Sequence, residues 1–321
     1  MSPQRRSALA LAGVAFAFLA TFSIIDPAFL TVANQRNVLQ QIGATVLLGT
    51  GMTLVVLTGG IDLAVASTAA LSAVAGAMAA SAAGFGSGAL ALGVVVALAT
   101  GAAVGTVQGS IVALAGVPPF LVTLAGLTVL RGAAFLLCDG VPVANFPEAA
   151  RGIGRGFVLE SWLGSSIPAS LVVVVAFVAA AEIVLRRTAF GRSLYAIGGN
   201  SEAARLAGLP VRRDLIAAYA VSGLAAAAGG LLVASRQGSA DPKLAREGLE
   251  LDAVAAVVLG GTSLSGGRGS AIRTFVGAWL IGSLRPVLNH LGVESYGQDV
   301  AVGLVILAAA LLDRFMGRGR D

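Results

Sequence analysis

The chain has 321 residues, of which 57% are hydrophobic and 12% charged, and its formal net charge is +5. This charged fraction is low, because a soluble domain carries about 25% charged residues. The apolar residues form blocks of roughly 17–25 residues, which is long enough to cross a membrane as a helix. We therefore expect an all-α polytopic membrane protein. One cysteine and one histidine exclude an internal disulfide and a multi-histidine metal site, and basic residues scattered between the apolar blocks argue against nucleic-acid binding.

The first apolar block follows MSPQRR and runs to Ile25. Its charge pattern is that of a signal peptide, but the apolar run is longer than the usual 7–15 residues. We therefore expect an uncleaved first span. The sequence predicts about ten transmembrane helices, some short or broken, and the eighth is too short for a regular span. The predicted spans are 8–25, 38–58, 63–83, 89–114, 119–138, 168–185, 214–235, 251–261, 272–290 and 299–312.

Basic residues predict the orientation of these spans. With the N-terminus inside, most of the 21 basic residues fall on the cytoplasmic side, which is the positive-inside pattern. An even number of spans then places both termini in the cytoplasm. We expect one transmembrane domain over residues 1–321, with a partly structured periplasmic loop at 139–167 and a polar cytoplasmic loop at 186–213.

Polar side chains at the start of the second span and in the fifth span are candidates for a translocation path. A path for an uncharged polar solute requires hydrogen-bonding amides and hydroxyls along it and no fixed charge. Interhelical hydrogen bonds are the alternative role for each of these residues. The candidate lining residues are Asn37, Gln40, Gln41, Thr123 and Thr128.

Paired glycines interrupt two apolar runs, VVLTGGIDL and VVLGGTSL. Each glycine costs about 1 kcal/mol in a helix interior relative to alanine, so these pairs predict helix breaks. Such breaks are hinges or line the path in transporters, and close helix crossing through small residues is the alternative. The four glycines are Gly59, Gly60, Gly260 and Gly261.

Asp62 is a carboxylate in an otherwise apolar stretch that follows the first glycine pair. A carboxylate at the start of a helix accepts free backbone N–H groups and faces the positive end of the helix dipole. We therefore expect Asp62 to cap the third span at a hinge; a substrate or proton site is the alternative.

A weak internal similarity relates residues 101–130 to residues 277–306. The offset pairs the fourth and fifth spans with the ninth and tenth, an odd shift of five spans. An odd shift makes the two halves face opposite ways, so we expect an inverted repeat of spans 2–5 and 7–10.

Four blocks of sequence resemble the permease subunit of ribose-type bacterial ABC importers for monosaccharides, in the family's order and spacing. They are GMTLVVLTGGIDLAVAS at 51–67, TLAGLTVLRGAAFLL at 123–137, GRSLYAIGGNSEAARLAGLPV at 191–211 and ELDAVAAVVLGGTSLSGGRGS at 250–270. The resemblance implies an inner-membrane transport subunit that is not an enzyme and binds no cofactor. It also implies three kinds of partner: a second permease copy or a paralogue, two cytoplasmic ATPase subunits that hold ATP and Mg²⁺, and a periplasmic sugar-binding protein.

A short helix is predicted within the loop 186–213. Asn200 and Ser201 are good N-caps, and Gly208 with Pro210 ends the helix after about two turns. A helix this short is unstable alone, so it must dock, either on anionic lipid or, as the resemblance implies, in a groove of the ATPase. The expected coupling residues are Glu202, Ala203, Ala204, Arg205, Leu206 and Gly208.

Other polar residues near span ends are not expected to take part in transport. Glu250 and Asp252 are expected to cap the eighth span, and His290 and Cys138 are expected to be incidental. Few carboxylates approach the spans, which argues against an ion-coupled secondary transporter. A permease for nucleosides or branched-chain amino acids remains the closer alternative.

Overall fold

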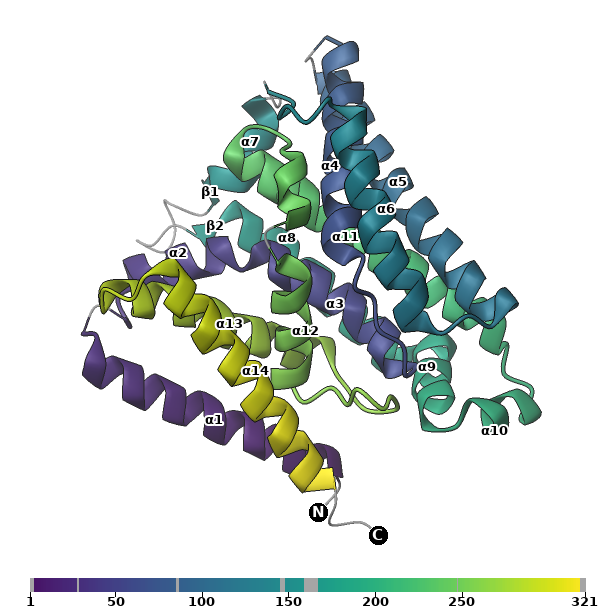
Figure 1. The fold of residues 1–321 in the computed structure, drawn as a ribbon. Coiled ribbons are helices and arrows are strands. Elements are labelled where there is room, and N and C mark those ends of the chain that lie inside the picture. Colours follow the sequence, from purple (N-terminus) through teal and green to yellow (C-terminus); the bar gives the residue numbers. More distant parts are fainter. Residues whose placement is uncertain are drawn as a thin grey trace.

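The computed structural model describes residues 3–27, 29–84, 87–144, 148–158, 167–246 and 248–317. Within these residues the chain is almost entirely α-helical, with one small antiparallel sheet (Figure 1). The elements are α1 (Pro3–Ile25), α2 (Val32–Gln41), α3 (Gly43–Leu57), α4 (Val65–Ala82), α5 (Ser87–Ala115), α6 (Pro119–Leu137), α7 (Glu148–Arg155), β1 (Phe157–Val158), β2 (Ile167–Pro168), α8 (Ala169–Arg187), α9 (Ala189–Gly199), α10 (Ser201–Leu206), α11 (Val211–Gln237), the 3₁₀ helix η1 (Pro242–Arg246), α12 (Leu249–Leu259), α13 (Ala271–His290) and α14 (Ser295–Gly317).

The apolar helices confirm an all-α membrane protein. In the described part of the chain, α4, α5, α6, α8 and α11 are each long and apolar enough to cross a membrane. A sixth span is formed if α2 and α3, which meet at a 50° bend, count as one broken helix. Nine of the ten predicted blocks each lie mainly on one helix, and the second block, 38–58, runs from the end of α2 through α3. The number of ten spans and the inverted repeat stay predictions.

Helix α3 forms the centre of the core. Every one of its residues is buried, which explains why its sequence is apolar on all sides and carries no charge. It packs against α11, α12 and α13. Helix α11 also crosses α5 very closely, because a Cβ placed on Gly101 would lie 2.3 Å from the carbonyl oxygen of Gly223. Glycines at this crossing therefore allow backbone contact between helices.

The two ends of the molecule differ in structure. Helices α9 and α10 lie at the lower right of Figure 1, and both labelled chain ends also lie on its lower side. On the opposite side, α7 packs on α11, and β1 pairs with β2, with Phe157 opposite Pro168. The predicted loop 139–167 thus contains ordered elements, although residues 145–147 and 159–166 lie outside the described part.

Candidate functional site

Helix α10 is the short helix that the sequence predicts. Asn200 is its N-cap, and the Oδ1 atom of Asn200 accepts the N–H of Ala203 at 2.9 Å. Gly208 follows the helix with a positive φ of 82°, a conformation that glycine adopts without strain. The local capping chemistry therefore fixes both ends of the helix.

Most side chains of α10 face away from the rest of the chain. Leu206 is 75% exposed, although large apolar side chains are normally buried, and Ala203 is exposed as well. Arg205 donates to Glu202 at 3.0 Å, and this hydrogen bond lowers the pKa of Glu202. Ala204 is buried, so, unlike the other predicted coupling residues, it packs within this chain.

Helix α9 makes backbone contact with two other segments. A Cβ on Gly198 would lie 1.8 Å from the carbonyl oxygen of Leu57, at the end of α3, and 2.4 Å from the nitrogen of Gly267. The Gly267 N–H itself donates to Leu57 O at 2.9 Å. Only glycine fits at position 198, because any side chain would separate α9 from α3 and from the loop before α13.

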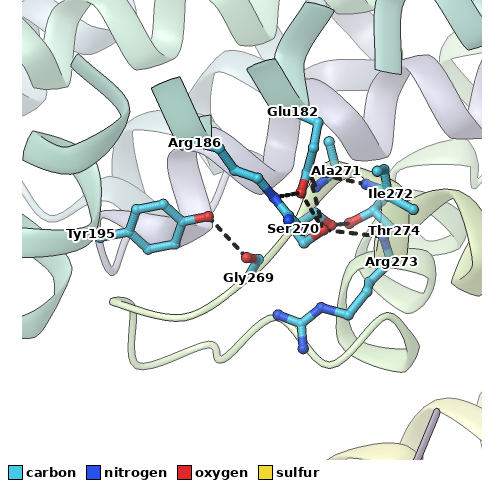
Figure 2. Close-up of polar contacts among 9 residues, drawn as sticks. All are labelled: Glu182, Arg186, Tyr195, Gly269, Ser270, Ala271, Ile272, Arg273 and Thr274. Atoms are coloured by element: carbon cyan, nitrogen blue, oxygen red, sulfur yellow. Dashed lines mark hydrogen bonds and ion pairs between the residues drawn. The ribbon is translucent and has the colours of Figure 1, made fainter. Parts of the chain in front are cut away.

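A buried carboxylate joins α8 to the start of α13 (Figure 2). Glu182 is 6% exposed, and its Oε2 atom accepts the N–H of Ala271 at 2.8 Å and that of Ile272 at 3.3 Å. Ser270, the N-cap of α13, donates its hydroxyl to the same oxygen at 3.0 Å. Arg186 pairs with the other oxygen. Glu182 thus satisfies backbone N–H groups that the helix cannot pair itself.

Tyr195 adds a second link between these elements. Its hydroxyl, on α9, donates to the carbonyl of Gly269 at 3.0 Å, just before α13 (Figure 2). Burial, and then the charge of Glu182, raises the pKa of Tyr195, so the phenol stays protonated and keeps donating. We call the contacts of α8, α9 and the loop 260–270 with one another and with the end of α3 the loop junction.

Glu182 was not identified as a linking residue from the sequence alone. One local signal was present: a carboxylate four residues before Arg186, a spacing that lets the two side chains pair on one helix face. The capped helix, however, begins 88 residues further along the chain. No local pattern indicates a contact over that separation.

Both glycine pairs lie at helix ends, as predicted. Gly59 and Gly261 adopt positive φ values of 83° and 71°, which a break requires. The other member of each pair permits close packing. A Cβ on Gly60 would lie 2.8 Å from the Tyr219 hydroxyl, and a Cβ on Gly260 would lie 2.7 Å from the carbonyl carbon of Arg273. The two expected roles, break and close contact, are thus divided within each pair.

Asp62 occupies the turn between α3 and α4 and is only 2% exposed. Its Oδ1 atom accepts the N–H of Ala64 at 3.1 Å, and Ser222 on α11 donates to Oδ2 at 2.8 Å. The N-cap of α4 is Ala64, which makes no side-chain cap bond. The predicted helix cap is therefore corrected: Asp62 stabilises the turn before the cap and ties it to α11.

A polar cavity of about 420 Å³ lies between α2, α12 and α13. Asn37, Gln40 and Gln41 line it, so the structure brings three of the five predicted path residues together. A second cavity of about 440 Å³ shares Asn37, Gln41 and Arg285 with the first. Because they share these residues, we treat the two as one region, the α2 cavity.

The remaining predicted path residues, both on α6, are not among those that line the α2 cavity. Thr123 is fully buried, and its hydroxyl donates to the carbonyl of Ile61 at 3.1 Å. Thr128 donates weakly to Leu124 O, within its own helix, at 3.4 Å. Thr123 thus ties α6 to the turn between α3 and α4, a structural contact similar to the alternative role considered for these residues.

Arg285, which lines the α2 cavity, pairs with two carboxylates. Arg285 contacts Asp252 at 3.4 Å and Asp299 at 3.1 Å. Asp252 was expected to cap α12, but the N-cap is Gly248 and no side chain caps the helix. His290 was expected to be incidental, yet its Nδ1 lies 2.7 Å from Asp26, just after α1. Both residues are thus parts of polar contacts between helices.

Comparisons with known proteins identify relatives over almost the whole chain. The family model described as "Branched-chain amino acid transport system / permease component" matches residues 34–310. The ribose import permease RbsC of Escherichia coli K12 is 44% identical over 301 residues, 92% of this chain and 90% of that protein. RbsC of Bacillus subtilis is 42% identical over 307 residues, which cover 93% of this chain and 90% of that protein. The L-arabinose ABC transporter permease AraH of Azospirillum brasilense is 35% identical over 308 residues, 94% and 87%. No solved structure matches the chain.

Proposed function

Because the chain belongs to the family of branched-chain amino acid transport system permease components, we propose that it is the transmembrane subunit of an ATP-driven ABC importer for a monosaccharide. The observation that carries the proposal is 44% identity to a ribose import permease over 92% of the chain. The arabinose permease relative extends the substrate class to pentoses in general. As a permease the chain is not itself an enzyme; it provides the path for a pentose or a hexose.

The proposed assembly contains four kinds of component. The chain pairs with a second copy or a paralogue, two cytoplasmic ATPase subunits bind ATP and Mg²⁺, and a periplasmic binding protein delivers the sugar. Helix α10 supports docking on an ATPase, because a six-residue helix with Leu206 75% exposed needs a partner surface. In this proposal Glu202, Ala203, Arg205 and Leu206 contact the ATPase, and Gly208 ends the docking helix.

We further propose ten spans in the bacterial inner membrane, with both termini cytoplasmic and spans 2–5 and 7–10 as inverted repeats. Two observations support this topology. Nine of the ten predicted blocks each lie mainly on one helix and the second covers the end of α2 with α3, and both labelled chain ends lie on the side of α9 and α10 in Figure 1. The α2 cavity then opens toward the periplasm, where the binding protein delivers its sugar.

Coupling in this proposal runs through the loop junction. Closure of the ATPase subunits displaces α10 and α9, and the contact of Gly198 with Leu57 passes this movement to α3. Glu182 passes it to α13 through the bonds to Ala271 and Ile272. The paired glycines at the ends of α3 and α12 are the hinges about which these helices change angle.

Reconstitution tests the proposal. Proteoliposomes with the permease, its ATPase and its binding protein should take up tritiated D-ribose, L-arabinose or D-galactose only when ATP is present. Uptake by the chain alone under an ion gradient would contradict the proposal and indicate a secondary transporter. The description of the family favours branched-chain amino acids as a second candidate class, and ATP-dependent uptake of leucine in place of the sugars would establish it. Nucleosides, the other alternative, are tested in the same assay with tritiated uridine.

A further inference from the structure

The helix break between α2 and α3 exposes two amide side chains in the α2 cavity. Helix α2 ends at Gln41, and the 50° bend directs α3 away from its axis. Asn37 and Gln41 are four residues apart, so they lie on one face of the last turn of α2. Both are exposed and both line the cavity. Neither side chain forms a hydrogen bond with any of the described residues, so both remain available to a ligand.

The charges around these amides are balanced. Arg285 lies between Asp252 and Asp299, on two different helices. A second cation, Arg236, donates to the carbonyl of Gln40 at 3.2 Å. An anionic ligand would have to displace two carboxylates from Arg285, whereas a neutral ligand leaves these pairs intact. The region therefore favours neutral molecules that donate and accept hydrogen bonds.

The lining and the size of the cavity suit a small polyhydroxyl compound. Ile42, Leu249 and Ile281 form an apolar part of the lining, and the amide side chains form a polar part. Gly282 allows Ile42 to pack closely on α13, since a Cβ at position 282 would lie 1.9 Å from Cγ2 of Ile42. A volume of about 420 Å³ is within the usual range of small-molecule sites. A sugar presents C–H groups on one face and hydroxyls around its edge, which matches this division.

We propose that the α2 cavity is a monosaccharide-binding site of the permease itself, in which Asn37 and Gln41 hydrogen-bond the sugar hydroxyls and the paired Arg285 excludes anionic sugars. This inference rests on the proposed function and extends it. The permease then binds the sugar selectively a second time, after the binding protein has released it.

Equilibrium binding tests the site directly. The permease with its ATPase subunits, in lipid nanodiscs and without the binding protein, is titrated with tritiated D-ribose, L-arabinose and D-galactose. We expect saturable binding of at least one sugar, weakened about tenfold in an Asn37→Ala, Gln41→Ala double variant that loses two hydrogen bonds. Thr106→Ala is the matched control, because Thr106 is an exposed polar residue of α5 outside the cavity lining.

A charge variant tests the selectivity. D-ribose 5-phosphate should not compete with the neutral sugar in the wild-type complex. In an Asp252→Asn, Asp299→Asn double variant Arg285 has lost both carboxylates, and we expect the phosphorylated sugar to compete. Competition in the wild type, or none in the variant, would overturn the role given to Arg285.

Transport by the complete importer separates this inference from the proposed function. If the importer takes up a sugar but the complex without binding protein binds none, or the Asn37, Gln41 variant binds as tightly as the wild type, the site is refuted and the importer stands. If the complete importer takes up no monosaccharide, the proposed function fails and the site fails with it.

Discussion

The two ends of α13 meet their neighbours in opposite ways. At its N-terminus, Glu182 and Ser270 are buried and hydrogen-bonded, and the neighbouring Gly198 lets backbones touch. Toward its other end, Arg285 is partly exposed beside amides that bind nothing within the described chain. Packed, fully paired contacts resist rearrangement, whereas an open polar cavity accepts a ligand. In the proposed mechanism, one end therefore transmits movement and the other responds to a substrate.

The largest effect is expected where backbones touch. In Gly198→Ala the added Cβ would overlap the carbonyl of Leu57, so α9 must separate from α3. We expect near-complete loss of ATP-dependent uptake and a decrease of about 3 kcal/mol in unfolding free energy. Uptake in proteoliposomes and denaturation in detergent measure these quantities.

Gly199→Ala is the matched control for this variant. A Cβ on Gly199 meets no atom within 4 Å, so uptake should be close to that of the wild type. An equal loss of uptake in both variants would show that the flexibility of α9 matters more than its contact with α3. The contrast between the loop junction and the α2 cavity would then not hold.

Loss of the Glu182 carboxylate should separate ATP hydrolysis from transport. Glu182→Ala leaves two N–H groups of α13 and the Ser270 hydroxyl without their acceptor, at a cost of about 2 kcal/mol. We expect uptake to decrease by more than tenfold while basal ATP hydrolysis continues. The ratio of sugar transported to ATP hydrolysed is the measurement.

Thr106 provides the comparison, because it is exposed on α5 and lies outside the loop junction. Thr106→Ala should leave the transport ratio close to that of the wild type. A Glu182→Ala protein with an unchanged ratio would mean that α13 is not part of the coupling path.

Leu206 tests the exposed surface of α10, the helix that packs on α9. Leu206→Glu replaces a 75% exposed apolar side chain with a charge, and the lost burial is worth about 2 kcal/mol at a docking surface. Affinity for the ATPase should fall about thirtyfold, measured by titrating the ATPase onto the permease in nanodiscs. Unchanged affinity would exclude α10 from the docking surface, whereas Thr106→Ala, far from α10 in sequence, should assemble normally.

The smallest effect is expected at Asp62. In Asp62→Asn the side-chain oxygen still accepts the N–H of Ala64, and only the bond with Ser222 weakens. Uptake should stay within a few-fold of the wild type, as it should in Ser222→Ala. Near-complete loss of uptake in Asp62→Asn, with normal insertion, would assign a mechanistic role to the carboxylate.

Local chemistry made some features predictable from sequence. The caps Asn200 and Gly208 define α10, and apolar blocks of membrane length mark the helices, because both signals depend only on neighbouring residues. The amides of α2 were predicted to line a translocation path; the structure brings them together in one cavity, and their role in a path stays a prediction.

Other features depend on contacts across the fold. Glu182 meets α13 across 88 residues of sequence, and Asp62 meets Ser222 across 160. Ala204 is buried because α10 packs on α9 and α11. A helix of six residues is too short for its pattern of apolar residues to show which side is buried. Such tertiary contacts cannot be inferred from local patterns.

The crossing of α13 over α12 has a mechanical consequence. Gly277 brings α13 onto α12, with a Cβ position 2.1 Å from the carbonyl of Ala256, and so provides a pivot. Arg285 lies eight residues beyond this pivot on α13, a distance of roughly 12 Å along the helix. Asp252 lies on the other helix of the crossing, α12. A tilt of about 10° displaces Arg285 by about 2 Å, enough to part it from Asp252. In the proposed coupling, a displacement of Glu182 moves the start of α13 and thereby opens the Arg285–Asp252 ion pair on the other side of the pivot.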